Sequence, residues 1–105
     1  MSEAVVVTVT FRPVAGARDE LVKALSAGIA EVHTETGCEL YAIHDAPDGT
    51  IIMLEKWSSA ADLEAHGAGD IVARMNATLV GLLESAPEIT LLSPIPAGSS
   101  YQGQL

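Results

Sequence analysis

Alternation of apolar and polar residues predicts four β-strands. Residues 4–11 are β-branched almost throughout. Residues 38–44 and 51–57 are also of strand type, and they flank the turn-forming stretch 46–49, so together they predict a hairpin. Residues 89–93 predict a final strand.

An apolar spacing of three and four residues predicts a helix between the first two strands. The helix starts near Ala17, and we expect it to end at Gly37. Its apolar positions form a single stripe that can face a sheet: Leu21, Leu25, Ile29 and Val32.

The helical period returns after the third strand. Ser59 is expected to cap a short helix, with Asp62 three positions later, and the glycine-containing stretch 67–69 ends it. A second stripe runs from Asp70 and stops before Pro87. This part of the chain is therefore predicted to be a broken helix.

The order strand, helix, strand, strand, broken helix, strand is the split βαβ pattern of ferredoxin-like α+β domains with a four-stranded antiparallel sheet. We assign residues 1–93 to this domain. Residues 94–105 contain prolines and glycines without periodicity, and they form a tail that is either mobile or packed on another subunit.

The predicted sheet has apolar residues on both faces, whereas two helices cover only one. A second copy of the chain is the simplest cover for the other face, which predicts a homodimer with the tail reaching across it. The alternative is an uncovered face of mixed polarity, because Thr8, Thr10 and Lys56 share it.

Composition narrows the function classes. The chain has 105 residues and a formal net charge of −9, so it should be repelled by nucleic acids and anionic membranes. No apolar run approaches the ~18 residues that span a bilayer. The start of the chain carries no basic segment before an apolar stretch, and Cys38 is the only cysteine, so we expect a cytoplasmic protein.

Side chains able to carry chemistry gather in the middle third, although aromatic residues are only 4% of the chain. They are Tyr41, His44, Glu55, Trp57 and His66. No phosphate-binding loop, zinc-binding histidine pair or nucleophile elbow is present. The three histidines fall in three different predicted elements, so no metal site is expected.

Glu55 is predicted to share a strand face with Trp57 and Met53. An apolar neighbourhood should raise the pKa of its carboxyl group and make it a candidate base. An ion pair with Arg12, Lys56 or Arg74, or a hydrogen bond to a loop, is the structural alternative. Trp57 is either a core residue or a platform for a ligand.

His66 lies at the end of the short predicted helix, where its ring can enter a cavity or remain a solvated helix-terminal group. His33, near the end of the long helix, is expected to be structural. Tyr41 and His44 point to opposite faces unless their strand bends. Met53 and Met75 are expected to be fillers of the hydrophobic core.

These residues resemble the antibiotic biosynthesis monooxygenase family, small dimeric α+β barrel proteins that include quinol monooxygenases. Three motifs occur in the family's order: Thr36-Gly37-Cys38 leading to Tyr41 and His44, then Glu55-Lys56-Trp57-Ser58, then Leu63 to His66. The resemblance covers residues 5–92.

The resemblance implies cofactor-independent oxidation of quinol- or anthrone-type aromatics by O₂, without flavin, metal or haem. It implies that His66 takes or relays a proton, that Trp57 stacks on the substrate and that Tyr41 binds substrate oxygens. His44, Glu55, Met53 and Met75 would complete the substrate site.

The chain departs from the family at residues 69–70, where a serine and a bulky residue are usual, and Thr36 replaces a proline. A haem-degrading branch uses an asparagine in the first strand, which residues 5–11 lack. Two other functions stay open: a non-catalytic ligand-binding or stress-associated dimer, and an isomerase or degrading enzyme for a small polar molecule.

Overall fold

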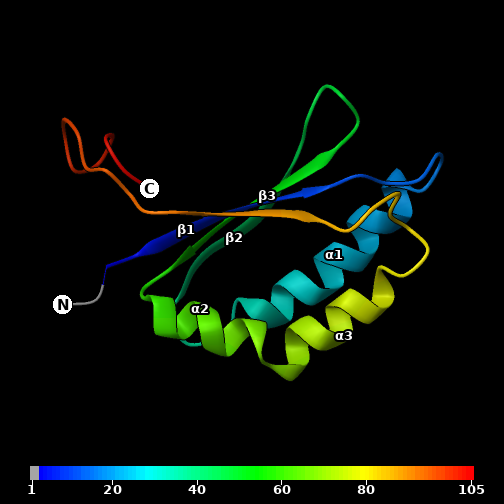
Figure 1. Cartoon of the computed structure of the whole chain (residues 1–105), viewed down its shortest axis with the longest axis horizontal. Helices are drawn as coiled ribbons and strands as arrows, with labels where there is room; N and C mark the ends of the chain where they lie inside the picture. Colours follow the sequence, from blue (N-terminus) through cyan, green and yellow to red (C-terminus); the bar gives the residue numbers. More distant parts are fainter. Residues whose placement is uncertain (1–2) are drawn as a thin grey trace.

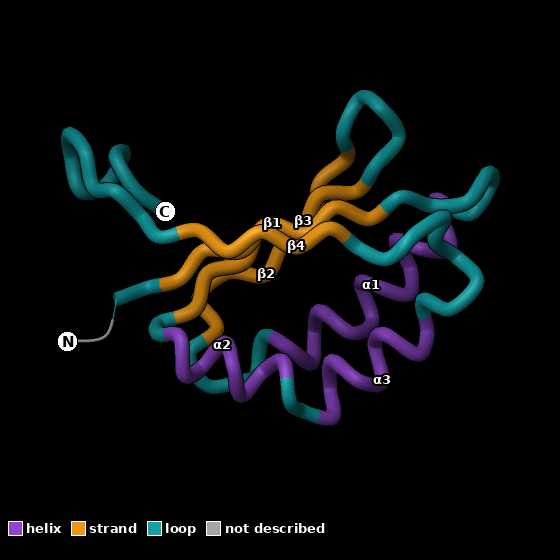
Figure 2. Tube along the Cα trace, viewed as in Figure 1, coloured by secondary structure: helices purple, strands orange, loops and turns teal. Residues whose placement is uncertain are grey.

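The computed structural model describes residues 3–105 as a four-stranded sheet with three helices (Figure 1). The strands lie in the order β2-β3-β1-β4, and each neighbouring pair is antiparallel. All helices lie on one face of this sheet (Figure 2). The predicted ferredoxin-like α+β fold is confirmed. The elements are β1 (Val5–Phe11), α1 (Arg18–Val32), β2 (Cys38–Asp45), β3 (Ile51–Trp57), α2 (Ala60–Gly67), α3 (Asp70–Thr78) and β4 (Glu88–Leu92).

The core lies between the sheet and the helices. Alternate residues of β1 and β3 point toward the helices. Val7 of β1 lies opposite Glu55 of β3, and Val9 lies opposite Met53, so these side chains share the helix-facing side of the sheet. The predicted stripe of α1 faces these strands, with Leu21 and Leu25 fully buried. Apolar burial on this face therefore holds the helices against the sheet.

Helix α1 ends at Val32 rather than at Gly37 as the sequence pattern predicted. Val32 is the last fully buried position of the stripe. Beyond it, the backbone tightens into turns in which Thr34 N donates to Glu31 O and Glu35 N donates to Val32 O. Gly37 then has a φ of 82°, which reverses the chain into β2.

Helix α3 is also shorter than its apolar stripe, since it ends at Thr78. Beyond it, the chain continues in tight turns in which each N–H donates to the carbonyl three residues earlier: Leu79 N donates to Asn76 O, and Leu82 N donates to Leu79 O. The expected cap of α2 is confirmed, because Ser59 Oγ accepts from the backbone N–H of Asp62 at 3.2 Å.

The sheet face opposite the helices carries no element of the described chain (Figure 2). It presents Ile52 and Leu54, which are half-buried, next to Thr8 and Lys56. Residues 93–105 form neither helix nor strand and extend from β4 away from the helices (Figure 1). Ile95 and Tyr101 of this tail are exposed. Among the described residues, no helix is both long and apolar enough to span a membrane.

Candidate active site

A cavity of about 500 Å³ lies between the sheet and helices α2 and α3. Its wall is mostly apolar, and helix α2 and strand β1 supply the largest shares of the lining residues, followed by α3, β3 and β4. The apolar lining includes Val5, Val7, Val9, Phe11, Met53, Val72, Met75, Leu79, Ile89 and Leu91. The polar lining residues are Tyr41, Glu55, Glu64, His66 and Asn76.

His66 contributes a buried imidazole to this wall. It stands in the last turn of α2, and only 6% of its side chain is exposed. Its Nδ1 lies 2.7 Å from Oε2 of Glu35. The alternative of a solvated helix-terminal histidine is therefore wrong, and the ring is held at the cavity.

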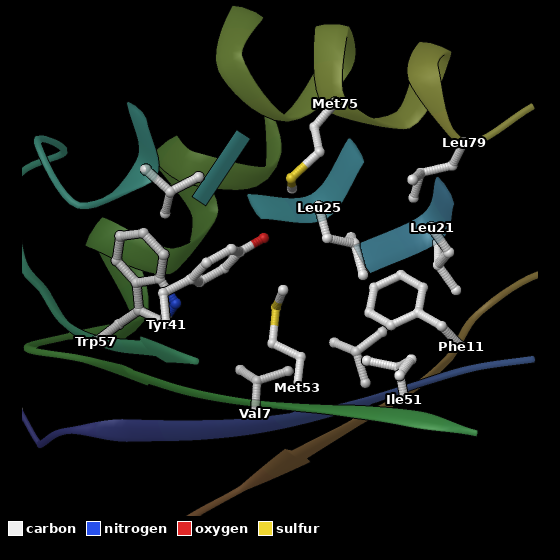
Figure 3. Close-up of a cluster of buried hydrophobic side chains, with 12 residues drawn as sticks. Val7, Phe11, Leu21, Leu25, Tyr41, Ile51, Met53, Trp57, Met75 and Leu79 are labelled. Atoms are coloured by element: carbon white, nitrogen blue, oxygen red, sulfur yellow. The ribbon is translucent and has the colours of Figure 1, made fainter. Parts of the chain in front are cut away.

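Three aromatic rings, including that of His66, pack together beside the cavity. The His66 ring centroid lies 4.6 Å from that of Trp57, with a tilt of 32°. Tyr41 meets His66 edge-on at 5.4 Å and Trp57 edge-on at 6.3 Å. Figure 3 shows the Tyr41 and Trp57 side chains next to each other at one end of the buried cluster. The imidazole is thus supported by two aromatic neighbours.

Tyr41 extends from β2 into the buried cluster that also holds Met53 of the sheet and Met75 of α3 (Figure 3). Every side-chain N or O atom that is fully buried in the described chain has a hydrogen-bond partner. Because the Tyr41 hydroxyl has no such partner among these residues, it is open to the cavity. Burial raises the pKa of Tyr41 well above its usual value, so it remains a neutral donor.

Glu55 is buried on the helix-facing side of β3, as predicted, and lines the cavity. Desolvation raises the pKa of its carboxyl group, while the hydrogen bond from Trp57 opposes that rise. Trp57 Nε1 donates to Oε1 of Glu55 at 2.9 Å. The alternative ion pairs are wrong, because Arg12, Lys56 and Arg74 each pair with another acid: Glu88, Glu39 and Glu31.

Two of the sequence-predicted site residues lie outside the cavity wall. His44, predicted to bind substrate, is exposed on the other sheet face, where Nδ1 contacts Ile52 O at 3.3 Å, so the structure does not bring it to this cavity. Because side chains alternate along a strand, His44 points to the sheet face opposite the one that Tyr41 occupies. Trp57 is fully buried against His66 and is not among the residues that line the cavity.

Sequence reasoning missed Glu35 as a site residue. Glu35 follows α1 in a turn, and only the fold brings it to His66, which is 31 positions away. Its place directly before Thr36-Gly37 was the available signal. The cavity wall formed by Ile89 and Leu91 was also missed, although their two-residue spacing in β4 matches the inward face of β1.

No group of three or more His, Cys, Asp or Glu residues within positions 3–105 is arranged to hold a metal ion. Cys38 is only partly buried, and desolvation raises the pKa of its thiol. The chemical groups at the cavity are thus an imidazole, a phenol, an amide and carboxyl groups. This set can bind oxygen functions and move a proton within an apolar enclosure.

Comparison with known proteins identifies a family whose model matches this chain. The family model for antibiotic biosynthesis monooxygenase matches residues 4–78, which contain α1, α2, α3 and the first three strands. Among curated proteins, no match to the chain was found.

Solved structures match most of the chain. Rv0793 from Mycobacterium tuberculosis shares 28% identity, with a TM-score of 0.83 over 91% of this chain and 99% of its own. PA3566 from Pseudomonas aeruginosa shares 26%, with a TM-score of 0.80 over 90% and 97%. A Caulobacter crescentus protein, provisionally described as an antibiotic biosynthesis monooxygenase, shares 24%, with a TM-score of 0.83 over 90% and 92%, and thus matches in fold.

Proposed function

The chain belongs to the antibiotic biosynthesis monooxygenase family, and from this premise we propose that it oxidises electron-rich aromatic molecules of the quinol or anthrone type with O₂ and without a cofactor. The observation that carries this proposal is the buried imidazole of His66 in the wall of a mostly apolar cavity. Such a cavity accepts a flat apolar ring system, and the imidazole meets its acidic hydrogen.

The chemistry needs only a proton acceptor and exclusion of water. In an anthrone, His66 removes a proton from the ring CH₂ group, or from the O–H group of the enol tautomer, which leaves an electron-rich anion. The anion gives one electron to O₂, and the resulting radical and superoxide join to form a C–O bond. Return of the proton from His66 gives a hydroperoxide, which loses water to leave a carbonyl group and thus a quinone.

The other polar residues bind and orient the substrate in this proposal. The neutral Tyr41 hydroxyl donates to a substrate oxygen and stabilises the anion there. Glu55 gives a second polar contact, while Met53 and Met75 form an adaptable apolar wall. Trp57 acts from behind by packing on His66 and holding Glu55.

We also propose that the working form is a homodimer. The helix-free sheet face leaves Ile52 and Leu54 without a cover within the described chain, and a second copy can bury them. Residues 94–105 would then pack on the partner, which gives the exposed Ile95 and Tyr101 a place of contact. A cytoplasmic location is part of the same proposal.

Oxygen uptake with a reduced anthrone or quinol tests the catalytic proposal. We expect uptake above the autoxidation rate, and we expect His66→Ala to abolish the excess. His33→Ala is the matched control, because His33 is exposed and lies outside the cavity wall. Tight binding of the aromatics without uptake would instead indicate a binding protein, and turnover of a small polar molecule would indicate the isomerase alternative.

A further inference from the structure

Glu35 is the only described residue that hydrogen-bonds to the His66 imidazole, and the catalytic proposal assigns it no role. Its carboxylate lies 2.7 Å from Nδ1, and its side chain is 17% exposed, against 6% for His66. A hydrogen bond this short and this shielded from water fixes the orientation of the ring.

The backbone holds Glu35 in place from both sides. Its N–H donates to Val32 O at 2.9 Å, and its carbonyl accepts from Cys38 N at 3.3 Å. The same turn lies against α2, because a side chain at Gly37 would collide with Asp62. The carboxylate therefore comes from a fixed turn and does not depend on a mobile loop.

The imidazole is fixed equally well. Trp57 and Tyr41 pack against it from two directions, and α2, which carries it, is capped at Ser59. A half-turn of the ring would leave its plane against Trp57 but would put a carbon atom in place of Nδ1 opposite Glu35, so the hydrogen bond selects the observed orientation. Nδ1 is thereby committed to Glu35, which leaves Nε2 as the ring nitrogen available to the cavity.

We propose that Glu35 is a positioning residue that keeps the ring proton of neutral His66 on Nδ1 and so presents Nε2 as the basic nitrogen. A carboxylate only accepts hydrogen bonds, whereas a neutral imidazole has one N–H, so the two groups meet at Nδ1 only in this tautomer. When Nε2 takes a proton, the carboxylate also stabilises the imidazolium that forms. The catalytic part of this role rests on the proposed function.

No other described acid can replace it. Glu55 is bonded to the Trp57 indole, and Glu31 pairs with Arg74 at an exposed site. Glu31 is in consequence a matched control for the loss of a nearby charge, since it stands four residues before Glu35 but does not touch His66.

Nitrogen-15 NMR of the histidine rings at alkaline pH tests the proposal without needing a substrate. In the wild type we expect His66 to carry its proton on Nδ1. His33 is an internal standard for the opposite tautomer, because its Nε2 lies 3.0 Å from the carbonyl oxygen of Tyr41, which can only accept. We expect Glu35→Leu to move the His66 proton toward Nε2, Glu35→Gln to fall between the two, and Glu31→Leu to change nothing.

A wild-type His66 with its proton on Nε2, or a tautomer that Glu35→Leu leaves unchanged, would overturn the proposal. If the wild type consumes O₂, we further expect Glu35→Leu to lower kcat about 10- to 100-fold, the range for one charge-assisted hydrogen bond, with little change in KM. If no aromatic supports O₂ uptake, the proposed oxidation fails, and the NMR result still decides the role of Glu35.

Discussion

Trp57 and Glu55 both point from β3 into the interior, and the indole N–H of Trp57 donates to the Glu55 carboxylate at 2.9 Å. This bond joins the largest side chain of the core to an acid of the cavity wall. The chain has one tryptophan, and its indole gives the buried carboxyl group its hydrogen-bond partner. Trp57 therefore contacts both Glu55 and His66, the two titratable side chains at this part of the cavity wall.

The raised pKa of Glu55 predicts a pH-dependent stability. The folded protein keeps a proton on this carboxyl group at pH values where the unfolded chain, with an ordinary pKa of 4.5, has lost it. Its stabilising contribution is thus fully present below the unfolded value and is lost as pH rises through the folded value. Glu55→Gln, which mimics the protonated form, should gain stability relative to the wild type as pH rises from about 4 to about 8.

Urea unfolding of both proteins across that range measures this difference. Glu39→Gln is the control, because Glu39 is exposed and pairs only distantly with Lys56 at 3.9 Å. If the free energies of unfolding of the wild type and Glu55→Gln change in parallel with pH, the pKa of Glu55 is not raised in the folded protein.

Tyr41→Phe should separate function from stability. Its hydroxyl faces the cavity without a partner in the described chain, so we expect the free energy of unfolding to change by less than about 1 kcal/mol. If the hydroxyl binds a substrate oxygen, kcat/KM should fall about tenfold. Calorimetry and steady-state kinetics on the same sample check both numbers, and a large loss of stability with unchanged kinetics would refute this role.

Gly28 controls the space beside Met75. A Cβ atom at Gly28 would lie 2.5 Å from Sδ and 2.8 Å from Cγ of Met75, which packs from α3 and lines the cavity. Alanine favours helix by about 1 kcal/mol, but overpacking costs about 1–3 kcal/mol, so Gly28→Ala should be destabilising or neutral. The substitution should also push Met75 into the cavity and so weaken the binding of aromatic ligands.

Ligand titration followed by Trp57 fluorescence tests this effect. The double variant Gly28→Ala/Met75→Ala removes the clash, so it should recover ligand binding. Unchanged affinity in the single variant would show that Met75 has room to move elsewhere.

The proposed dimer predicts that a charge on the helix-free sheet face separates the subunits. Leu54→Glu places a carboxylate near the middle of that face, between Thr8 and Ala42 of the neighbouring strands. We expect light scattering after size exclusion to show a dimer for the wild type and a monomer for Leu54→Glu. Val80→Glu, at an exposed position after α3, should remain dimeric. A monomeric wild type at micromolar concentration would exclude the dimer.

The order of the elements was predictable because each segment carries a local signal. The β-branched run of residues 4–11, the Ser59 cap and the glycine-containing break at residues 67–69 all act within a few residues. The helix ends were less predictable. Val32 and Thr78 end their helices because the chain must turn back to the sheet, although the apolar pattern continues beyond Thr78.

The site was predictable only in part. Strand alternation correctly placed Glu55 with Trp57, but whether Trp57 lines a cavity depends on how α2 packs over β3, which no local pattern specifies. Glu35 reaches His66 through a turn and a helix that approach each other in three dimensions. His44 has chemistry suited to a site, yet its strand face directs it away.

The most direct test of the central claim is turnover of an anthrone under ¹⁸O₂, with mass spectrometry of the product. The account predicts one ¹⁸O atom in the new carbonyl group, formed at a rate that falls to the autoxidation level in His66→Ala. A parallel reaction in H₂¹⁸O with ordinary O₂ corrects for exchange of the carbonyl oxygen with water. Product without label from O₂, or labelled product formed equally fast by His66→Ala, would contradict it.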